Sequence, residues 1–301
     1  MIGAAARARR SVRLFRLGLS TLLGRPRGYF LPYRYAAAAP RSPRAYPAVE
    51  DALRAHEPAF LRVLAAIEEH GRALETIGRG ASSPPEPRWD QGWFPRLDAA
   101  AAYVLVRGLA PRRIIEVGGG HSTRFLARAI RDGGLASELI TVDPHPRATL
   151  DGVAARHVAA MVETVDPALF RSLGPGDIAF VDSSHILVPG SDVDFILNIV
   201  LPSLPAGVYV HFHDVFLPDD YPAEWVWRGY NEQTALPGLI VGGAYEPVFA
   251  SRYVTTRMKG QLGGSVLDRL ARVEGAHESS LWLKKRAPAS NGIAAAAGVA
   301  P

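Results

Sequence analysis

The sequence of 301 residues contains no cysteine, which excludes disulfide bridges, zinc sites built from thiolates and cysteine nucleophiles. It also lacks a run of about 20 consecutive apolar residues, the length that a transmembrane helix requires. The best candidate, residues 14–24, is short and is interrupted by Arg16. Arginines before this segment resemble the start of a signal peptide, but Arg25 and Arg27 follow it without a small-residue cleavage site. We therefore expect a cytoplasmic protein.

Acidic residues are missing from residues 1–47, which hold ten arginines. The formal net charge of +5 belongs to this segment, because the remaining residues carry 24 basic and 29 acidic side chains. The high isoelectric point therefore describes an arm and not the body of the protein, and we expect no nucleic-acid partner.

Residues 1–24 have the apolar spacing of an amphipathic helix. Val12, Phe15, Leu19 and Leu22 follow one another at three or four residues, and arginines fill other positions. Such a helix either packs on the protein itself or on a second subunit, or lies peripherally on an anionic membrane surface such as the inner membrane. Proline, arginine and tyrosine then predict an extended arm over residues 25–47.

The rest of the chain shows several shifts in pattern. Helical periodicity returns over residues 48–77, and glycine, serine and proline mark 78–87 as a linker. Further expected elements are helices over 97–109 and 222–236, a strand over 248–255, and a loop with a short helix over 260–275. These patterns divide the chain into a basic arm and helix (1–88), a main domain (89–286) and a disordered tail (287–301).

The most informative segment is 112–123, which reads Arg-Arg-Ile-Ile-Glu-Val-Gly-Gly-Gly-His-Ser-Thr. Its β-branched run predicts a buried strand, and residues 118–120 predict a turn at which no Cβ obstructs a ligand. Ser122 or Thr123 can cap a helix that continues through residues 125–130. A strand, a glycine loop and a helix in this order form a nucleotide cradle at the carboxyl end of a parallel sheet.

Thr123 stands where the dinucleotide-binding pattern G-x-G-x-x-G has its third glycine, and Glu116 precedes the loop. This E-x-G-x-G pattern resembles the first motif of the class I S-adenosylmethionine-dependent methyltransferases. Further segments resemble that family in the same order, and together they cover roughly residues 89–285: 139–144, 177–185, 205–214 and 281–284. Residues 210–222, Val-His-Phe-His-Asp-Val-Phe-Leu-Pro-Asp-Asp-Tyr-Pro, resemble bacterial small-molecule O-methyltransferase-like proteins.

Strands and helices alternate from residue 112 to residue 214, which predicts right-handed βαβ units and a parallel sheet. The resemblance implies an α/β, Rossmann-like sheet of seven strands, mostly parallel with an antiparallel final strand, plus an N-terminal helical or extended appendage. No long crossover helix is evident between the last two expected strands, near Val248 and Leu281, so the sequence allows an antiparallel hairpin at one edge.

The resemblance implies that S-adenosylmethionine binds at the tips of the first two strands. Glu116 is expected to order the glycine loop, and the Ser122 hydroxyl to contact the methionine carboxylate. Asp143 ends the second strand, 25 residues after Gly118, where a carboxylate can accept both ribose hydroxyls of either an adenosyl or a dinucleotide cofactor. The predicted cofactor-binding residues are Glu116, Gly118, Gly119, Gly120, Ser122, Thr123, Asp143 and Asp182.

Asp182 and Asp214 follow the hydrophobic runs of two central strands and are expected beside the donor methyl group. Both are candidate ligands of Mg²⁺, which takes oxygen ligands. Resemblance to the catechol-type O-methyltransferases implies that such an ion lowers the pKa of the acceptor hydroxyl. Those enzymes have an Asp-Asn pair after the fifth strand, whereas Val215 follows Asp214 here. The candidates to replace the missing ligand are His213, His185 and Asp219.

A second possible chemistry needs no metal. His213 or His185 would remove the acceptor proton, with Asp214 or Asp182 orienting the ring. His211 and His213 are two residues apart on a strand and so point to the same face, with His213 nearer the tip. The predicted catalytic residues are His213, Asp214 and His185.

The predicted function is methyl transfer from S-adenosylmethionine to a hydroxyl of a small molecule or glycan. Residues 182–185, Asp-Ser-Ser-His, differ from the Asn/Asp-Pro-Pro-aromatic motif of base-methylating enzymes. The alternatives are an NAD(P)-dependent oxidoreductase, whose fingerprint Thr123 breaks, and a non-catalytic, membrane-associated cofactor-binding protein. Residues 219–222 and the segment with Trp225, Trp227, Tyr230, Asn231 and Glu232 are candidates to wall the acceptor pocket. Alternatively, the tryptophans pack their helix onto the sheet.

Overall fold

A computed structural model of the chain describes residues 4–25, 34–35, 38, 44–80 and 83–287. The chain divides into two compact units, one of residues 1–44 and 220–229 and the other of residues 45–219 and 230–301. Residues 45–88, which the sequence pattern grouped with the arm, thus lie in the same unit as the main domain. Most of the predicted extended arm, and the predicted tail apart from Ala287, lie outside the described residues.

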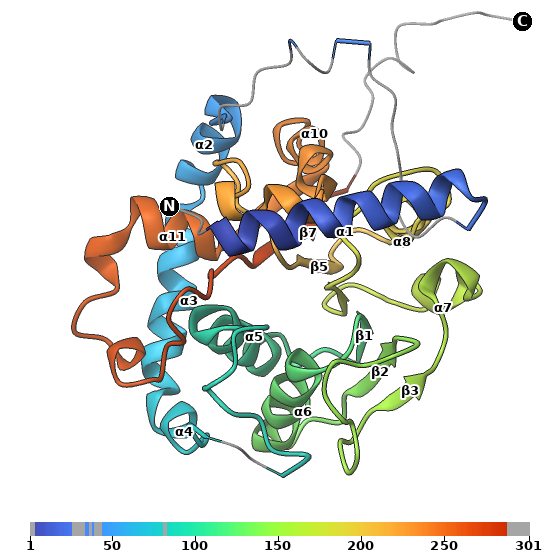
Figure 1. Cartoon of the computed structure of the whole chain (residues 1–301). Helices are drawn as coiled ribbons and strands as arrows, with labels where there is room; N and C mark the ends of the chain where they lie inside the picture. The colour runs from blue at the N-terminus through green and yellow to red at the C-terminus, as the bar shows by residue number, and fades with distance from the viewer. Residues whose placement is uncertain (1–3, 26–33, 36–37, 39–43, 81–82, 288–301) are drawn as a thin grey trace, which may run out of the picture. The chain divides into compact units, whose positions relative to one another are not determined.

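The described residues of the larger unit form a seven-stranded sheet in the order β3-β2-β1-β4-β5-β7-β6 (Figure 1). The strands are β1 (Arg113–Val117), β2 (Glu138–Val142), β3 (Arg156–Val158), β4 (Ile178–Val181), β5 (Tyr209–Phe212), β6 (Tyr245–Ala250) and β7 (Leu281–Lys285). Strands β1 to β5 pair in parallel, and β7 runs antiparallel to both of its neighbours. The predicted Rossmann-like, mostly parallel sheet with an antiparallel final strand is therefore confirmed.

The central strands are apolar because helices and loops cover both faces of the sheet. All four side chains of β4, Ile-Ala-Phe-Val, are buried, as are the last four of β1. Apart from Glu116 in β1 these residues are apolar, as is typical of parallel strands, which are buried on both sides. The strand order reverses between β1 and β4, and ligands of such sheets bind outside the carboxyl ends of the strands at this point.

Helices α5 and α6 pack against each other, and α3 packs on α5 and β6 (Figure 1). The α-helices of the larger unit are α2 (Pro47–Arg54), α3 (Glu57–Glu69), α4 (Gly71–Glu75), α5 (Arg96–Leu109), α6 (His121–Gly133), α7 (Ala168–Arg171), α8 (Asp192–Phe195), α9 (Leu201–Ser203), α10 (Leu236–Val241) and α11 (Ser251–Arg257). Single turns of other helix types are η1 (Val162–Thr164), η2 (Ile196–Val200), η4 (Glu232–Thr234), η5 (Lys259–Gln261) and η6 (Val266–Asp268). The smaller unit contains α1 (Ala4–Leu22) and η3 (Ala223–Arg228).

Three predicted elements differ from the structure. The helix expected over 48–77 is broken into α2, α3 and α4, whose junctions lie at residues 55–56 and at His70. The helix expected over 222–236 is two 3-10 turns, because Gly229 adopts a left-handed conformation with φ +72° between them. The strand expected over 248–255 ends at Ala250, and Ser251 begins α11.

No helix in the described part of the chain is both long enough and apolar enough to cross a membrane.

Candidate active site

The glycine loop lies between the tips of β1, β2 and β4. The N–H of Gly118 donates to the carbonyl of Val142 (3.0 Å), and the N–H of Asp182 donates to the last carbonyl of β1 (2.9 Å). Gly118 has φ +84°, and a Cβ there would lie 1.8 Å from the carbonyl oxygen of Asp182. A Cβ on Gly119 would lie 2.6 Å from Cγ2 of Thr141. Glycine is therefore required at both positions by the approach of neighbouring strands.

Glu116, the fully buried acid of β1, holds this loop in place through hydrogen bonds. Its carboxylate accepts hydrogen bonds from the hydroxyls of Ser122 (2.7 Å), Thr123 (2.6 Å) and Thr141 (2.8 Å). The Thr123 hydroxyl also accepts the N–H of Gly120 (2.9 Å). Burial raises the pKa of Glu116 to about 7, against the opposing effect of these three donors.

The Ser122 hydroxyl, predicted to contact the methionine carboxylate, donates a hydrogen bond to Glu116 in the structure. Ser122 and Thr123 are 3% and 0% exposed, and their hydroxyl hydrogens point into the protein. Both side chains therefore act on the shape of the loop.

Asp143 lies at the tip of β2, half-buried, beside the loop. One carboxylate oxygen accepts the N–H of Gly119 (2.7 Å), and the other accepts the N–H of His145 (2.7 Å). A carboxylate oxygen can accept more than one hydrogen bond, so both oxygens retain capacity for a ligand's hydroxyls.

Two orphaned polar atoms lie near the start of α6. Nδ1 of His121 and Nε of Arg88 are buried and have no hydrogen-bond partner among the described residues. Burial, together with the nearby positive charges of Arg88 and Arg124, lowers the pKa of His121 to about 4. This neutral imidazole and the two guanidinium groups make the helix N-terminus a place that favours an anionic ligand group.

The carboxyl ends of β4 and β5 bring together Asp182, His185 and Asp214, here called the strand-tip cluster. Nε2 of His185 lies 3.3 Å from Oδ1 of Asp182 and 3.4 Å from Oδ2 of Asp214. It makes no well-directed hydrogen bond to any described residue, although its side chain is only 1% exposed. His185 and Asp214 have left-handed backbones, with φ +62° and +55°. Such strain in non-glycine residues is typical of functional sites.

The other ring nitrogen of His185 is held by a residue that has no motif in the sequence. Nδ1 lies 2.8 Å from Oε2 of Glu232, and both side chains are 1% exposed. The ring of Tyr230 packs on the imidazole, with centroids 4.6 Å apart. A carboxylate behind one nitrogen fixes the ring and directs the other nitrogen toward the cluster, as in the outer shell of metal-binding histidines.

His213 lies behind the cluster and contacts Asp98 from α5. Its Nε2 is 3.2 Å from Oδ2 of Asp98, and its Nδ1 is 3.4 Å from Oδ1 of Asp214. The Asp98 carboxylate is fully buried and also accepts the N–H groups of Ser279 (2.9 Å) and Ser280 (3.0 Å). His213 thus lies between carboxylates on both sides.

The charges of these groups depend on one another. Burial alone lowers the pKa of His185 and of His213, but the surrounding carboxylates raise both well above the usual value. Burial raises the pKa of Asp182, but the charge of His213 and the nearby His185 hold it well below its usual range. Burial and the charge of His213 lower the pKa of His211, whose Nε2 bonds the Ser280 hydroxyl at 2.8 Å. His211 is therefore a neutral, structural histidine.

Asp219, one of the candidate replacement ligands, does not join the cluster. Its carboxylate pairs with Arg252 (3.1 Å) and with Arg257 (2.7 Å). Both histidines have a ring nitrogen near Asp182 and Asp214, but it is Nε2 of His185 that is buried without a hydrogen-bond partner among the described residues.

The sequence did not predict a role for Asp98, and it placed Glu232 only among the residues that could wall the acceptor pocket, not as the partner of His185. A weak signal existed for Asp98, because it is the one acid in the otherwise apolar run of residues 97–106. Nothing in the periodicity of residues 231–233 distinguishes Glu232 from an exposed turn residue.

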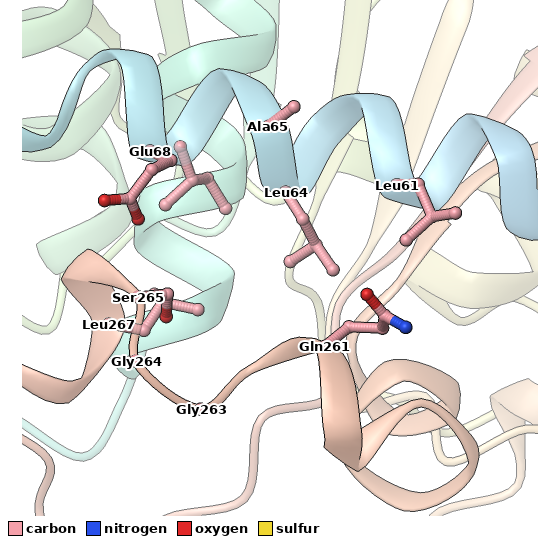
Figure 2. Close-up of a pocket in the computed structure, with 10 residues that line it drawn as sticks. Leu61, Leu64, Ala65, Glu68, Gln261, Gly263, Gly264, Ser265 and Leu267 are labelled. Atoms are coloured by element: carbon pink, nitrogen blue, oxygen red, sulfur yellow. The ribbon is translucent and has the colours of Figure 1, made fainter.

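A separate cavity of about 430 Å³ lies between α3 and the segment 261–267, away from every predicted site residue (Figure 2). Leu61 and Leu64 point into it from the helix. The carboxylate of Glu68 at its rim accepts the N–H of Val266 (2.7 Å). This lining offers no cluster of reactive groups, so the strand tips remain the candidate active site.

Residues 115–215, from β1 to just beyond Asp214, match a family model described as a methyltransferase domain. No curated protein matches the sequence.

Several solved structures resemble the chain at low identity. The methyltransferase PaMTH1 of Podospora anserina, with S-adenosylhomocysteine bound, is 17% identical over 86% of this chain and 100% of its own, with a TM-score of 0.35. Cofactor-bound Rv0187 from MTB is 20% identical over 76% and 90%, with a TM-score of 0.36. The O-methyltransferase TomG of Streptomyces achromogenes, with SAM bound, is 18% identical over 75% and 90%, with a TM-score of 0.38. Scores this low assign no role to a residue of this chain.

Proposed function

We propose that this chain, a class I S-adenosylmethionine-dependent methyltransferase, methylates a hydroxyl group of a small molecule or glycan at the strand-tip cluster. The observation that carries the proposal is the meeting of Asp182, His185 and Asp214 directly beside the glycine loop. The sulfonium of S-adenosylmethionine supplies the methyl group. Because the transfer is an in-line displacement, the protein contributes mainly by holding donor and acceptor in line.

The residues at the tips of β1 and β2 suit the donor. Asp143 has free acceptor capacity for the two ribose hydroxyls. The orphaned nitrogens of His121 and Arg88 suit the methionine carboxylate at the start of α6. Glu116 keeps the loop in shape without touching the donor.

The strand-tip cluster suits a divalent cation. Single ligand atoms from Asp182, His185 and Asp214 lie within 4.8 Å of one another, and one of them is the orphaned Nε2. Two carboxylates fit Mg²⁺, and an imidazole third ligand extends the fit to Mn²⁺. An ion held by these three residues would lower the pKa of an acceptor hydroxyl.

His213 is the group that we assign to receive the proton of the acceptor hydroxyl. In the reaction the hydroxyl oxygen forms the new C–O bond, the C–S bond breaks, and the hydroxyl proton moves to Nδ1. The charges of Asp182 and Asp214 raise the pKa of His213. While these carboxylates have no other cationic partner, His213 therefore keeps its own proton. Its role as a base therefore depends on these carboxylates having another cationic partner.

Calorimetric titration tests the donor site. S-adenosylhomocysteine should bind and NADH should not, because Thr123 breaks the dinucleotide fingerprint. Asp143→Asn should weaken S-adenosylhomocysteine binding by about tenfold or more, since hydrogen bonds to a carboxylate contribute about 1.5–3 kcal/mol. Asp151→Asn, the same change at an exposed residue of the following loop, should leave the affinity unchanged. NADH binding would contradict the proposal and favour an oxidoreductase.

Titration with Mn²⁺ and Mg²⁺ tests the cation site, with bound Mn²⁺ followed by electron paramagnetic resonance. Asp182→Asn and Asp214→Asn should abolish binding, and Asp166→Asn at an exposed position should not. Binding that survives both cluster variants would show that the ion lies elsewhere.

A further inference from the structure

The smaller compact unit, residues 1–44 with 220–229, has a strongly positive net charge, whereas the larger unit has a negative one. Its ten arginines in residues 1–44 and Arg228 are balanced by only two acids, Asp220 and Glu224, so its net charge is +9. With the whole chain at +5, the larger unit is left at −4. The positive charge is thus a property of one unit and not of the fold that holds the active site.

Within that unit, α1 presents an apolar stripe to solvent. Val12, Phe15, Leu19 and Leu22 recur at three or four residues and therefore lie on one face of the helix. Their exposed fractions are 52%, 71%, 43% and 85%, and Leu23 beside them is 70% exposed. A folded protein seldom leaves so many neighbouring apolar side chains uncovered without a partner.

Positively charged arginine side chains flank this apolar stripe. Arg16 follows Phe15 and is exposed, and Arg25 is exposed just beyond the end of the helix. No acid occurs anywhere in residues 1–47, so nothing in this segment offsets the arginines. An apolar stripe flanked by arginines is complementary to a surface with acyl chains below and anionic groups above.

We propose that α1 docks this protein on an anionic lipid surface. The stripe of Val12, Phe15, Leu19, Leu22 and Leu23 enters the boundary between headgroups and acyl chains, and Arg16 and Arg25 contact the anionic headgroups. The charge complementarity favours lipid over a second copy of the chain, because two copies would bring two +9 units together.

Sedimentation of the full-length protein with vesicles tests the proposal. The wild type should bind vesicles of phosphatidylcholine containing phosphatidylglycerol, should bind far less to phosphatidylcholine alone, and should be released by added salt. Phe15→Gln should weaken the partition to anionic vesicles by about tenfold, the equivalent of losing one buried aromatic side chain.

Leu14→Gln is the matched control. Leu14 is also exposed, at 50%, and the same residue is introduced, but it lies off the stripe because residues two apart do not share a helix face. Its effect should stay below about threefold, since it leaves the stripe intact. Circular dichroism checks that both variants keep the helix.

Three results would overturn the proposal. They are a wild type that ignores anionic vesicles, equal losses for Phe15→Gln and Leu14→Gln, and equal binding to vesicles with and without anionic lipid. Light scattering, which measures the oligomeric state, gives one further test. A wild-type dimer that Phe15→Gln converts to a monomer would assign the stripe to a second copy of the chain.

Discussion

Glu116 illustrates how one buried side chain can set both the shape of a loop and a dependence on pH. Its pKa is about 7 in the folded protein and 4.5 in an ordinary environment, because burial disfavours the charged form. The folded state therefore binds the proton more tightly than the unfolded state does. Its stabilising contribution is complete below pH 4.5 and is lost as the pH rises toward 7.

We therefore predict that Glu116→Gln changes the pH dependence of stability. The free energy of unfolding of the wild type, measured with urea and expressed relative to the variant, should fall by about 3 kcal/mol between pH 4.5 and pH 7. Contributions of other acids cancel in this difference. Glu69→Gln, the same change at an exposed position, is the control variant. A flat difference for Glu116→Gln would mean that this carboxylate titrates normally.

Glu232 is the residue through which the orientation of His185 can be tested. Removing its negative charge should let the imidazole rotate and make it a weaker ligand, because the carboxylate fixes the ring and raises its basicity. We predict that Glu232→Gln weakens Mn²⁺ binding by about 10–100-fold, the usual effect of losing such a partner. S-adenosylhomocysteine affinity should remain unchanged, because Glu232 contacts no residue of the glycine loop in the described structure. An unchanged Mn²⁺ affinity would remove His185 from the proposed ligand set.

At the scale of an element, the strand–loop–helix unit of β1 and α6 has little freedom to vary. A methyl group on Gly119 would lie 2.6 Å from Cγ2 of Thr141, whose hydroxyl is tied to Glu116. The side chain cannot turn away without losing that buried bond, so Gly119→Ala should cost about 2 kcal/mol of stability.

The double variant Gly119→Ala, Thr141→Ser tests whether the methyl group of Thr141 causes this loss of stability. Serine keeps the hydroxyl that donates to Glu116 and removes the methyl group that obstructs the alanine. Thermal unfolding should therefore show recovery of most of the lost stability in the double variant relative to Gly119→Ala. Gly118→Ala should not be recovered by Thr141→Ser, because its Cβ meets the backbone of Asp182 at 1.8 Å. Equal rescue of both glycine variants would contradict this geometry.

The elements that the sequence predicts best are those with a strong local pattern. The apolar runs of β1, β2, β4 and β5, and the glycines that follow β1, are visible in the sequence as local patterns. The strand expected over 248–255 failed because alternation persists beyond Ala250, where the backbone turns into α11 and Tyr253 and Val254 become buried as helix residues. The helix expected over 222–236 failed because a single glycine, Gly229, takes a left-handed conformation.

The residues of the candidate site also divide into those that the sequence predicts and those that it does not. Asp182, Asp214 and His213 are predictable because the carboxyl ends of neighbouring parallel strands must meet at one edge of the sheet. Asp98 and Glu232 come from α5 and η4, which reach the histidines only through the packing of segments distant in sequence. No periodicity encodes such a contact, so these partners required the structure.

At the scale of the larger unit, the start of α5 is joined to the segment just before β7. Oε1 of Glu278 accepts the Nε–H of Arg96 (3.1 Å) and the N–H of Leu97 (3.0 Å). Asp98 holds the N–H groups of the next two residues, just before β7. The start of α5 and the approach to β7 lie about 180 residues apart in the chain. These bonds therefore link the helix that precedes β1 to the approach to β7, the last strand in the chain.

The last prediction concerns this link. The side chains of Arg96 and Glu278 are 12% and 2% exposed, so Glu278→Ala leaves a buried guanidinium without its carboxylate and a backbone N–H without its acceptor. Breaking a buried pair in this way costs about 3 kcal/mol, which lowers the Tm of a unit of this size by roughly 6–12 °C.

Glu138→Ala removes a carboxylate that is 43% exposed and pairs with Arg113, and it should cost much less because water screens such pairs. If the link ties the unit together, Glu278→Ala should shift one cooperative transition, with far- and near-ultraviolet circular dichroism moving together. A small loss equal to that of Glu138→Ala, or an early separate transition of β7, would mean that the two ends of the unit are stabilised independently.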